Sequence, residues 1–364
     1  MSVHKDKKHN TWYVKYQNRT KRGFKTKRDA LLYESKLMLS NNTEDDAIRF
    51  YDLINEYLSF KKADVQYTTY LKYKEGIEIV MKPNFPNKPV NQISSYDCDV
   101  FKTIVQDLNY SSNYKNKLLT QFKGIFNYAV KRNYIITNPA AMMKSFKKTT
   151  GELESEKYRE GNVWSNDEFY QFVECVEETV YKALFMTLFL TGMRLGEALA
   201  LSWSDLSNSE LSITKSHTKQ TEKGSYEIKI PKNTSSVRVV AINRSLNKML
   251  LDLKETARQT TIDFSEKDFI FGGKKPLSRT TIDRKKDEAV MKSGVKRIRI
   301  HDFRHSHASI LITNGMNIVS VSKRLGHSDV NMTLKVYTHL INKKDEKLLS
   351  FLEDSSHNSS HENR

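Results

Sequence analysis

His301-Asp302-Phe303-Arg304-His305 stands in the last quarter of the chain and places two histidines and an arginine within five residues. From here to Leu311 the pattern predicts a helix that starts near Asp302 and buries one side. The expected buried side consists of Phe303, His307, Ile310 and Leu311. His301 and Arg304 stand three residues apart, so both side chains are expected to point at one ligand from the same helix.

Two further motifs, Leu325-Gly326-His327 and Tyr337, follow this helix along the chain. Residues 318–325 predict a second helix, and Gly326 is expected to end it and to hold His327 just beyond its last turn. A final helix is expected around Tyr337. Its packing face consists of Met332, Val336 and Leu340, which leaves Tyr337 beside that face.

A third motif, Thr191-Gly192-Met193-Arg194-Leu195-Gly196-Glu197, lies upstream. Gly192 predicts the end of an apolar helix over 181–191, and Arg194 is expected to begin a second helix over 195–201. A phosphate held by Arg194 would then also meet the positive end of that helix. We expect Glu197 to hold the Arg194 region in place.

The residue types in these motifs suit a reaction at a phosphodiester. A tyrosine phenol can attack phosphorus and form a covalent ester, which conserves the bond energy of the broken strand. The transition state carries negative charge on the non-bridging oxygens, and the planar fork of arginine binds two such oxygens without deprotonating. Tyr337, Arg194 and Arg304 therefore form a candidate phosphoryl-transfer site.

This chemistry also needs an acid for the departing 5′-oxygen, because an alkoxide is a poor leaving group. Residues 226–230 alternate as in a strand, and residues 237–242 are expected to pair with it. Lys232 lies on the connecting hairpin and is one candidate for the acid. Lys229 and Lys219 remain open as alternatives.

Each of these residues also has a simpler interpretation. Arg194 with Glu197 is, taken alone, more often an ordinary helix start, and Tyr337 alone is more often a core tyrosine. His301, His305 and His307 could instead be metal ligands, although no cysteine or carboxylate motif accompanies them. The occurrence of all the residues in one order favours the phosphoryl-transfer interpretation.

The composition is strongly basic: the 364 residues carry a formal net charge of +17, with a pI near 9.5. Nucleic acid is the commonest partner for such a charge, although a ribosomal or membrane-surface protein has the same sign. The longest apolar run, 183–190, is too short to span a bilayer, which takes about 20 residues. The amino-terminal segment has no apolar signal core. Cys98 and Cys175 are widely separated, as in a reduced cytoplasmic protein.

Residues 1–45 predict a small folded unit. Apolar and polar side chains alternate over 12–16 as in a strand, Phe24 lies on a further strand, and 27–39 have helical spacing. The alternative is a solvated basic tail. The candidate DNA-binding side chains are Lys15, Arg19, Lys21, Arg22 and Lys25.

The rest of the chain divides into four parts. Residues 46–143 contain four segments with helical spacing, over 48–58, 68–81, 97–108 and 112–132. Residues 144–162 are polar and predict a linker. A catalytic domain is expected over 163–352, opening with a capping box of Ser165 and Glu168. A disordered tail is expected over 353–364.

Together these motifs resemble the catalytic domain of tyrosine recombinases, in particular the integrases of phages and integrative elements. The resemblance implies a multidomain, mainly α fold. A small amino-terminal sheet with a helix would bind arm-type DNA sites, a helical SAM-like domain would bind the core site, and a mixed α/β catalytic domain would carry a small antiparallel sheet. It also implies a site-specific recombinase that cleaves and rejoins DNA through a 3′-phosphotyrosyl intermediate, and so integrates and excises a phage or conjugative element.

The resemblance implies a role for each catalytic residue. Tyr337 would be the nucleophile, Arg194 with Arg304 the phosphate clamp, and Lys232 the general acid. His301 would serve as a base or proton relay, and His327 would hydrogen-bond a non-bridging oxygen. No metal, ATP or other cofactor is implied.

The implied partners are double-stranded DNA attachment sites and a homotetramer that exchanges strands through a Holliday junction. A DNA-bending host factor and an excisionase are expected as accessory proteins, residues 343–352 are expected to pack on a neighbouring protomer, and no membrane partner is expected. The expected location is the bacterial cytoplasm, at the nucleoid. Three alternatives remain: a chromosome-dimer resolvase, which would lack the basic amino-terminal unit; a type IB topoisomerase; and a non-catalytic DNA-binding regulator, which would lack a catalytic residue.

Overall fold

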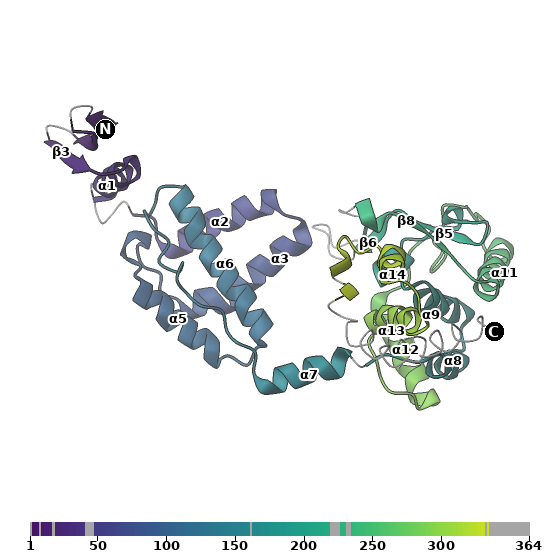
Figure 1. Ribbon diagram of the computed structural model, residues 1–364. Coiled ribbons are helices and arrows are strands. Elements are labelled where there is room, and N and C mark those ends of the chain that lie inside the picture. Colours follow the sequence, from purple (N-terminus) through teal and green to yellow (C-terminus); the bar gives the residue numbers. More distant parts are fainter. Residues whose placement is uncertain are drawn as a thin grey trace, which may run out of the picture. The chain divides into compact units, whose positions relative to one another are not determined.

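The computed structural model describes residues 2–6, 9–16, 19–40, 47–160, 162–218, 226–230, 234–331 and 333–334. The chain divides into two compact units, Met1–Ser155 and Glu156–Arg364 (Figure 1). This division falls inside the stretch 144–162 that the sequence predicts as a linker. Among the described residues, no helix combines the length and apolar character needed to cross a membrane.

The first unit opens with a three-stranded antiparallel sheet and one helix. Strands β1 (Ser2–Asp6), β2 (Thr11–Tyr16) and β3 (Arg19–Phe24) lie in that order, and helix α1 covers Lys27–Ser40. Val14 of β2 and Ala30 of α1 are buried. The alternating pattern of residues 12–16 therefore does form a half-buried strand, and the interpretation of this segment as a solvated tail is wrong.

A helical bundle makes up the rest of the first unit. Its main helices are α2 (Phe50–Asp64), α3 (Tyr67–Gly76), α5 (Ser95–Asp107) and α6 (Ser112–Lys131). A π-helical turn η2 (Ile77–Met81), helix α4 (Lys82–Asn84) and a 3-10 turn η3 (Val90–Gln92) connect α3 to α5. The four helices expected from apolar spacing are confirmed.

Buried phenylalanines hold this bundle together. Phe50 of α2 lies 4.5 Å from Phe85 between ring centroids, and Phe101 of α5 stacks on Phe122 of α6 at 4.4 Å. Such aromatic contacts add to the stabilisation that comes from removing the rings from water. Val100 of α5, next to Phe101 in sequence, is 42% exposed.

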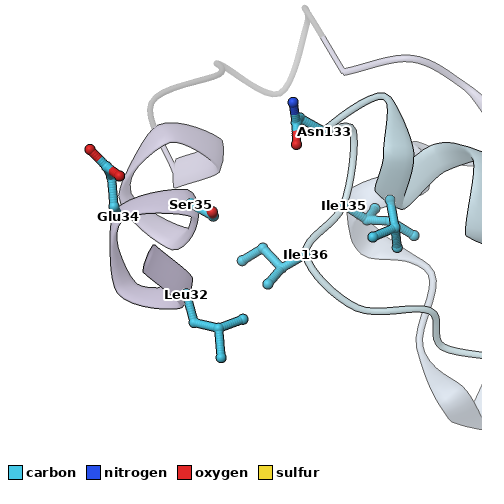
Figure 2. A pocket seen from close by; sticks show the side chains of 7 residues that line it. Leu32, Glu34, Ser35, Asn133, Ile135 and Ile136 are labelled. Atoms are coloured by element: carbon cyan, nitrogen blue, oxygen red, sulfur yellow. The ribbon is translucent and has the colours of Figure 1, made fainter. Parts of the chain in front are cut away.

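A small pocket of about 330 Å³ lies between α1 and the segment that follows α6 (Figure 2). Leu32 and Ser35 of α1 line it together with Ile135 and Ile136. Among the described residues that line the pocket, Glu34 is the titratable one. The pocket therefore offers no set of groups that could perform acid–base or nucleophilic chemistry.

The expected linker contains a helix, α7 (Thr150–Glu160), which the polar composition did not predict. The Thr149 hydroxyl and the Glu152 carboxylate cap its start, and Glu152 also accepts hydrogen bonds of 2.6 Å from both the backbone N–H and the hydroxyl of Ser112. These bonds, first that from the Ser112 hydroxyl, lower the pKa of Glu152 to about 2. Capping and one anchor point thus support a helix that buries few apolar side chains.

The second unit is mixed α/β. Its helices are α8 (Asn166–Glu174), α9 (Thr179–Thr191), α10 (Leu195–Ala198), α11 (Arg244–Thr260), α12 (Arg279–Ser293), α13 (Ile300–Thr313) and α14 (Ile318–Leu325). Short 3-10 turns are η4 (Trp203–Asp205) and η5 (Thr234–Ser236). The capping box of Ser165 and Glu168 is confirmed at the start of α8.

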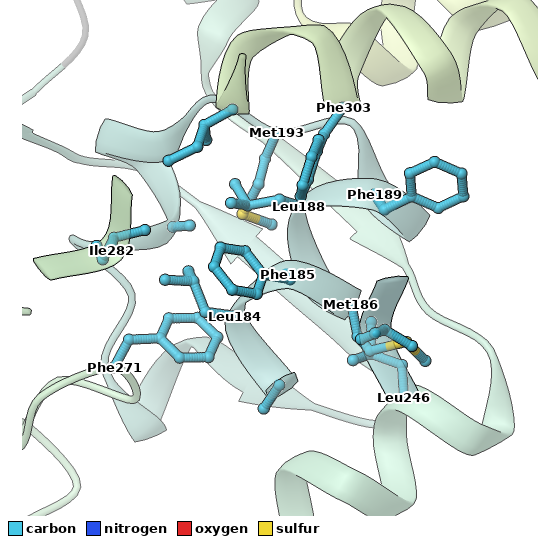
Figure 3. Close-up of a cluster of buried hydrophobic side chains, with 14 of the residues drawn as sticks. Leu184, Phe185, Met186, Leu188, Phe189, Met193, Leu246, Phe271, Ile282 and Phe303 are labelled. Atoms are coloured by element: carbon cyan, nitrogen blue, oxygen red, sulfur yellow. The ribbon is translucent and has the colours of Figure 1, made fainter. Parts of the chain in front are cut away.

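Helices α9 and α13 cross in the core of this unit. Phe185 and Phe189 of α9 lie beside Phe303 of α13, and all three side chains are almost fully buried (Figure 3). Phe169 of α8 stacks in parallel on Phe189, with ring centroids 3.7 Å apart. This packing sets the orientation of α13, the helix that carries His301 and Arg304.

The strand pairing in this unit differs from the prediction. Strand β7 (Glu227–Lys229) pairs with β6 (Ser216–Thr218), whereas β8 (Arg238–Ala241) pairs with β5 (Glu210–Ile213), which also pairs with β4 (Leu206–Ser207). The expected pairing of residues 226–230 with 237–242 is therefore wrong. Val240 of β8 lies opposite Leu211 of β5, and both are buried in the core, which draws β8 into the larger sheet.

Candidate active site

Gly192 and Arg304 join two helices at the centre of the candidate site. Gly192 ends α9 in the left-handed conformation, with φ +67°, as the sequence predicts. Its carbonyl oxygen accepts a 2.8 Å hydrogen bond from Nη1 of Arg304, whose residue is only 4% exposed. A Cβ on Gly192 would lie 2.6 Å from Cδ2 of His307, so glycine is what lets α13 approach this closely.

Arg194 lies two residues farther on, at the N-cap of α10. Its Nη1 donates to Oε1 of Glu197 at 2.8 Å, and its backbone N–H donates to Oε2 at 2.9 Å. The side chain remains 38% exposed, while that of Glu197 is 3% exposed. Helix α10 has only four residues instead of the seven expected, so its dipole adds little to the binding of a phosphate here.

The predicted role of Glu197 as a support for Arg194 agrees with these contacts. Burial acts to raise the pKa of Glu197, but the hydrogen bond and charge of Arg238, followed by the contacts with Arg194, lower it overall. The carboxylate is therefore charged at neutral pH. Arg238 was not singled out from the sequence, because a single arginine on a strand has no distinguishing local pattern.

His301 lies in the first turn of α13, exposed, next to a second histidine. Its ring centroid is 5.1 Å from that of His305, with the rings nearly perpendicular. Loss of water on the side of the ring that faces the protein, together with the charges of His305 and Arg304, lowers the pKa of His301 to about 4. At neutral pH this imidazole is neutral and can accept a proton.

His327 follows the left-handed Gly326 that ends α14, as predicted. Its Nδ1 lies 2.7 Å from the Thr333 hydroxyl. Burial, and then the charges of Arg304 and Arg194, lower the pKa of His327 to about 4. Gly326, the residue before His327, lies against Arg238: a Cβ at Gly326 would be 2.9 Å from Nη1 of Arg238. Nη2 of Arg238 binds Glu197, the carboxylate that also holds Arg194. The structure thus brings Arg194, Arg304, His301 and His327 together.

Two predicted catalytic residues, Lys232 and Tyr337, lie outside the described residues, as does the alternative acid Lys219. The other alternative, Lys229 of β7, forms a 2.9 Å ion pair with Glu227. The described strands before and after Lys232, β7 and β8, belong to two different sheets.

A buried network that the sequence did not predict supports these residues. Nε of Arg324 donates to Nε2 of His307 at 3.1 Å, and its Nη2 donates to the carbonyl oxygens of Leu190 and Ala241. Burial and the charge of Arg324 lower the pKa of His307 to about 3, so this ring is neutral.

The interpretation of His301, His305 and His307 as metal ligands has no support in this arrangement, because a hydrogen bond occupies Nε2 of His307. Among the described residues, no group of three or more histidine, cysteine, aspartate or glutamate side chains is arranged to hold a metal ion.

His301 also borders a wider cavity of about 800 Å³. Its cationic lining residues are Arg279, Lys286, Arg297 and Arg299, and its acidic ones are Asp283, Asp287 and Asp302. Arg299 is bound to Asp302 through a 2.7 Å ion pair, and Arg297 to Asp287 at the same distance. Neighbouring carboxylates therefore neutralise most of the positive charge in this cavity.

The candidate DNA-binding residues of the first unit lie on its small sheet. Lys15, Lys21, Arg22 and Lys25 are all exposed. The guanidinium of Arg22 lies 5.5 Å from the ring centroid of Tyr13, which orients it on the surface. The side chain of Arg19 lies outside the described part of the structure.

Residues 163–344, half of the chain, match the phage integrase family, and residues 49–102 match the amino-terminal SAM-like domain of phage integrases. The chain therefore belongs to the phage integrase family: it is a site-specific tyrosine recombinase, an enzyme of DNA strand exchange. The resemblance of this sequence to the tyrosine recombinase family is confirmed.

Among proteins of this family, the chain is similar over most of its length to integrases of mobile elements. It is 29% identical to the ICEBs1 integrase of Bacillus subtilis strain 168, over 92% of each chain. It is 28% identical to the integrase of Staphylococcus phage L54a, over 88% of this chain and 97% of the phage protein.

Solved structures establish the fold. The Tn1549 transposon integrase, in complex with transposon right-end DNA, matches 82% of this chain and 98% of its own, with a TM-score of 0.66 at 17% identity. A lambda integrase tetramer bound to a Holliday junction matches 92% and 94%, with a TM-score of 0.59 at 16% identity. The expected multidomain, mainly helical fold with small antiparallel sheets is confirmed.

Proposed function

We propose that this integrase inserts and excises a phage or conjugative element by cleaving double-stranded DNA at attachment sites with Tyr337. The observation that carries the proposal is the convergence of Arg194, Arg304 and His327 in the second unit. Two cations and a neutral imidazole around one point suit a phosphodiester whose oxygens gain charge in the transition state.

The two arginines hold the scissile phosphate in this proposal. Arg304 reaches the site with one edge of its guanidinium held by the Gly192 carbonyl. Arg194 is held by Glu197 and keeps an exposed part of its side chain for the ligand. Because neither guanidinium loses its proton, the clamp remains charged throughout the reaction.

His327 donates a hydrogen bond to a non-bridging oxygen. Its lowered pKa keeps the ring neutral, with one N–H to donate. When the Thr333 hydroxyl donates to Nδ1, the ring N–H is on Nε2 and can be donated to that oxygen.

The covalent step begins when Oη of Tyr337 attacks phosphorus and its proton passes to His301, which is neutral and can accept it. The bond from phosphorus to the 5′-oxygen breaks, and Lys232 gives that oxygen a proton. A 3′-phosphotyrosyl ester remains, and attack by the 5′-hydroxyl of a second duplex reverses the step. These residues need neither a metal nor ATP for this exchange, because the ester conserves the bond energy.

DNA binding and assembly follow from the same family membership. We propose a homotetramer on two duplexes that passes through a Holliday junction, supported by the tetramer that the lambda integrase forms on such a junction. Residues 46–143 would bind the core site and residues 1–45 the arm sites, through exposed Lys15, Lys21, Arg22 and Lys25. The corresponding domains are 1–45, 46–143, 163–352 and a tail 353–364, with 144–162 between the second and third.

Accessory proteins complete the proposal. A DNA-bending host factor would bring arm and core sites together, and an excisionase would set the direction of the reaction at the nucleoid. A chromosome-dimer resolvase is disfavoured by the folded basic sheet of residues 2–24, which that class would lack. A non-catalytic regulator is disfavoured because the chain retains every catalytic residue type in order.

The experiment uses a nicked suicide substrate. Cleavage releases a short fragment that carries the new 5′-hydroxyl, and its diffusion away prevents religation and traps the covalent adduct. The wild-type protein should form an adduct that survives denaturing electrophoresis, whereas Tyr337→Phe should bind the same DNA and form none. Peptide mapping should find the DNA on Tyr337. An adduct that persists in Tyr337→Phe would contradict the assignment of the nucleophile.

A further inference from the structure

Arg238 forms the densest set of buried contacts near the candidate site, although it does not belong to the predicted catalytic set. Its side chain, on β8, is 7% exposed. Nη2 donates to Oε2 of Glu197 at 2.9 Å, Nε donates to the carbonyl oxygen of Arg324 at 2.7 Å, and Nη1 donates to that of Ser236 at 3.1 Å. One guanidinium on β8 therefore joins α10, the end of α14 and the turn η5.

The charges around Glu197 give these contacts a consequence for the reaction. Glu197 is almost fully buried and holds Arg194 through both carboxylate oxygens. A buried carboxylate that faces one guanidinium would cancel its charge, and a neutral pair attracts a phosphate poorly. With Arg238 as a second cation on Oε2, the group of three carries a net charge of one positive unit.

We propose that Arg238 is a positioning residue that neutralises Glu197, so that Glu197 can hold Arg194 in place without cancelling its charge toward the phosphate. The inference rests on the proposed function, because it assumes that Arg194 binds the scissile phosphate. Arg238 itself does not touch the substrate. Its side chain is buried behind Glu197, and all three of its described donors are directed at protein oxygens.

The second set of contacts extends this effect to His327. The carbonyl of Arg324 that Arg238 binds comes three residues before His327, and a Cβ on Gly326 would lie 2.9 Å from Nη1 of Arg238. Glycine at this position therefore leaves room for the guanidinium. Arg238 thus fixes the turn that presents His327 as well as the carboxylate that holds Arg194.

The test is a double-mutant cycle on the full chain, read as the single-turnover rate of adduct formation on the suicide substrate at saturating protein. Arg238→Met should slow cleavage about tenfold or more, because Glu197 then cancels the charge of Arg194 toward the phosphate, without a matching loss of DNA affinity in gel shifts. Adding Glu197→Gln should restore much of that rate, because the unneutralised carboxylate is then gone. A purely structural role predicts instead that the double variant is at least as slow as Arg238→Met.

Two further variants keep the cycle decisive. Arg238→Gln, which can still donate hydrogen bonds but carries no charge, goes through the same cycle in case the methionine variant does not fold. Lys274→Met removes the cation 3.0 Å from Asp268, a carboxylate outside the site, and should leave the cleavage rate unchanged. Thermal melting reports the folded state of each variant.

The outcomes separate this inference from the proposed function. A wild-type protein that forms no adduct contradicts the proposed function. A wild-type protein that cleaves, with the double variant no faster than the single Arg238 variant, contradicts the counter-charge role and leaves the proposed function standing. If adding Glu197→Gln raises the cleavage rate of Arg238→Met or of Arg238→Gln, the result supports the role of Arg238 as the counter-charge of Glu197.

Discussion

Replacing Gly192 by alanine tests how closely α9, α13 and α14 meet. Gly192 has φ +67°, and an added Cβ would lie 2.6 Å from Cδ2 of His307 and 2.8 Å from Cδ2 of Leu325. The His307 ring cannot turn aside without losing the hydrogen bond from Arg324. The substitution therefore combines backbone strain with a steric clash against a fixed neighbour.

The expected loss of stability in Gly192→Ala is the sum of these two effects. The left-handed conformation costs a non-glycine residue about 1–2 kcal/mol. Overpacking of a well-packed site costs about 1–3 kcal/mol more. The sum, about 2–5 kcal/mol, corresponds to a fall in Tm of about 5–15 °C for a unit of this size. Because the carbonyl of residue 192 also holds Arg304, cleavage should slow as well.

Gly294 offers a matched control for thermal unfolding followed by circular dichroism. It ends α12 with φ +70°, but nothing lies within 4 Å of an added Cβ. Gly294→Ala should therefore lower the free energy of unfolding only by the cost of the left-handed backbone conformation, about 1–2 kcal/mol. Equal falls in Tm for the two variants would refute the argument that close packing requires glycine at position 192.

Three other predictions concern catalysis, pH and salt. Arg304→Ala, and separately Arg194→Ala, should slow adduct formation about 10²-fold or more; near-wild-type rates in both would remove these residues from the phosphate. The pKa of His307 is lowered from 6.5 to about 3 in the folded protein, so its contribution to the free energy of unfolding is fully present above pH 6.5. The unfolded state binds the proton first as the pH falls, so this contribution is lost toward pH 3. The Tm of the wild type should thus fall more steeply than that of His307→Gln between pH 6.5 and about 4, and parallel curves would exclude this effect. Deleting residues 1–45 should flatten the salt dependence of binding to arm-site DNA by about 0.9 log unit for each phosphate that the shortened protein no longer neutralises; an unchanged slope would mean that this segment does not bind DNA.

Local sequence signals predicted the elements that carry the site. Gly192 and Gly326 do end their helices in the left-handed conformation, and the capping box of Ser165 does open α8. These predictions succeed because a helix end depends on a few adjacent residues. Motif order also predicted the family, because Arg194, Arg304 and His327 occur in an order that other folds seldom share.

Predictions that depended on distant partners failed. Strand β8 pairs with β5 instead of β7, because Val240 finds its buried neighbour in Leu211. Helix α7 forms in a polar segment because Ser112, about 40 residues away in sequence, binds Glu152. Neither partner is visible in the local pattern of the segment itself.

The sequence by itself determined the chemistry of this protein: the identity and order of the candidate catalytic groups, and the glycines that end the helices before Arg194 and His327. The tertiary structure alone decided how those groups are charged and held. Desolvation and neighbouring positive charges keep His301, His307 and His327 neutral. The contacts of Arg238 and Arg324 join α9, α10, α13, α14 and β8 around the site. The physical reason is that hydration and electrostatic interactions depend on distances in space, which sequence spacing does not specify.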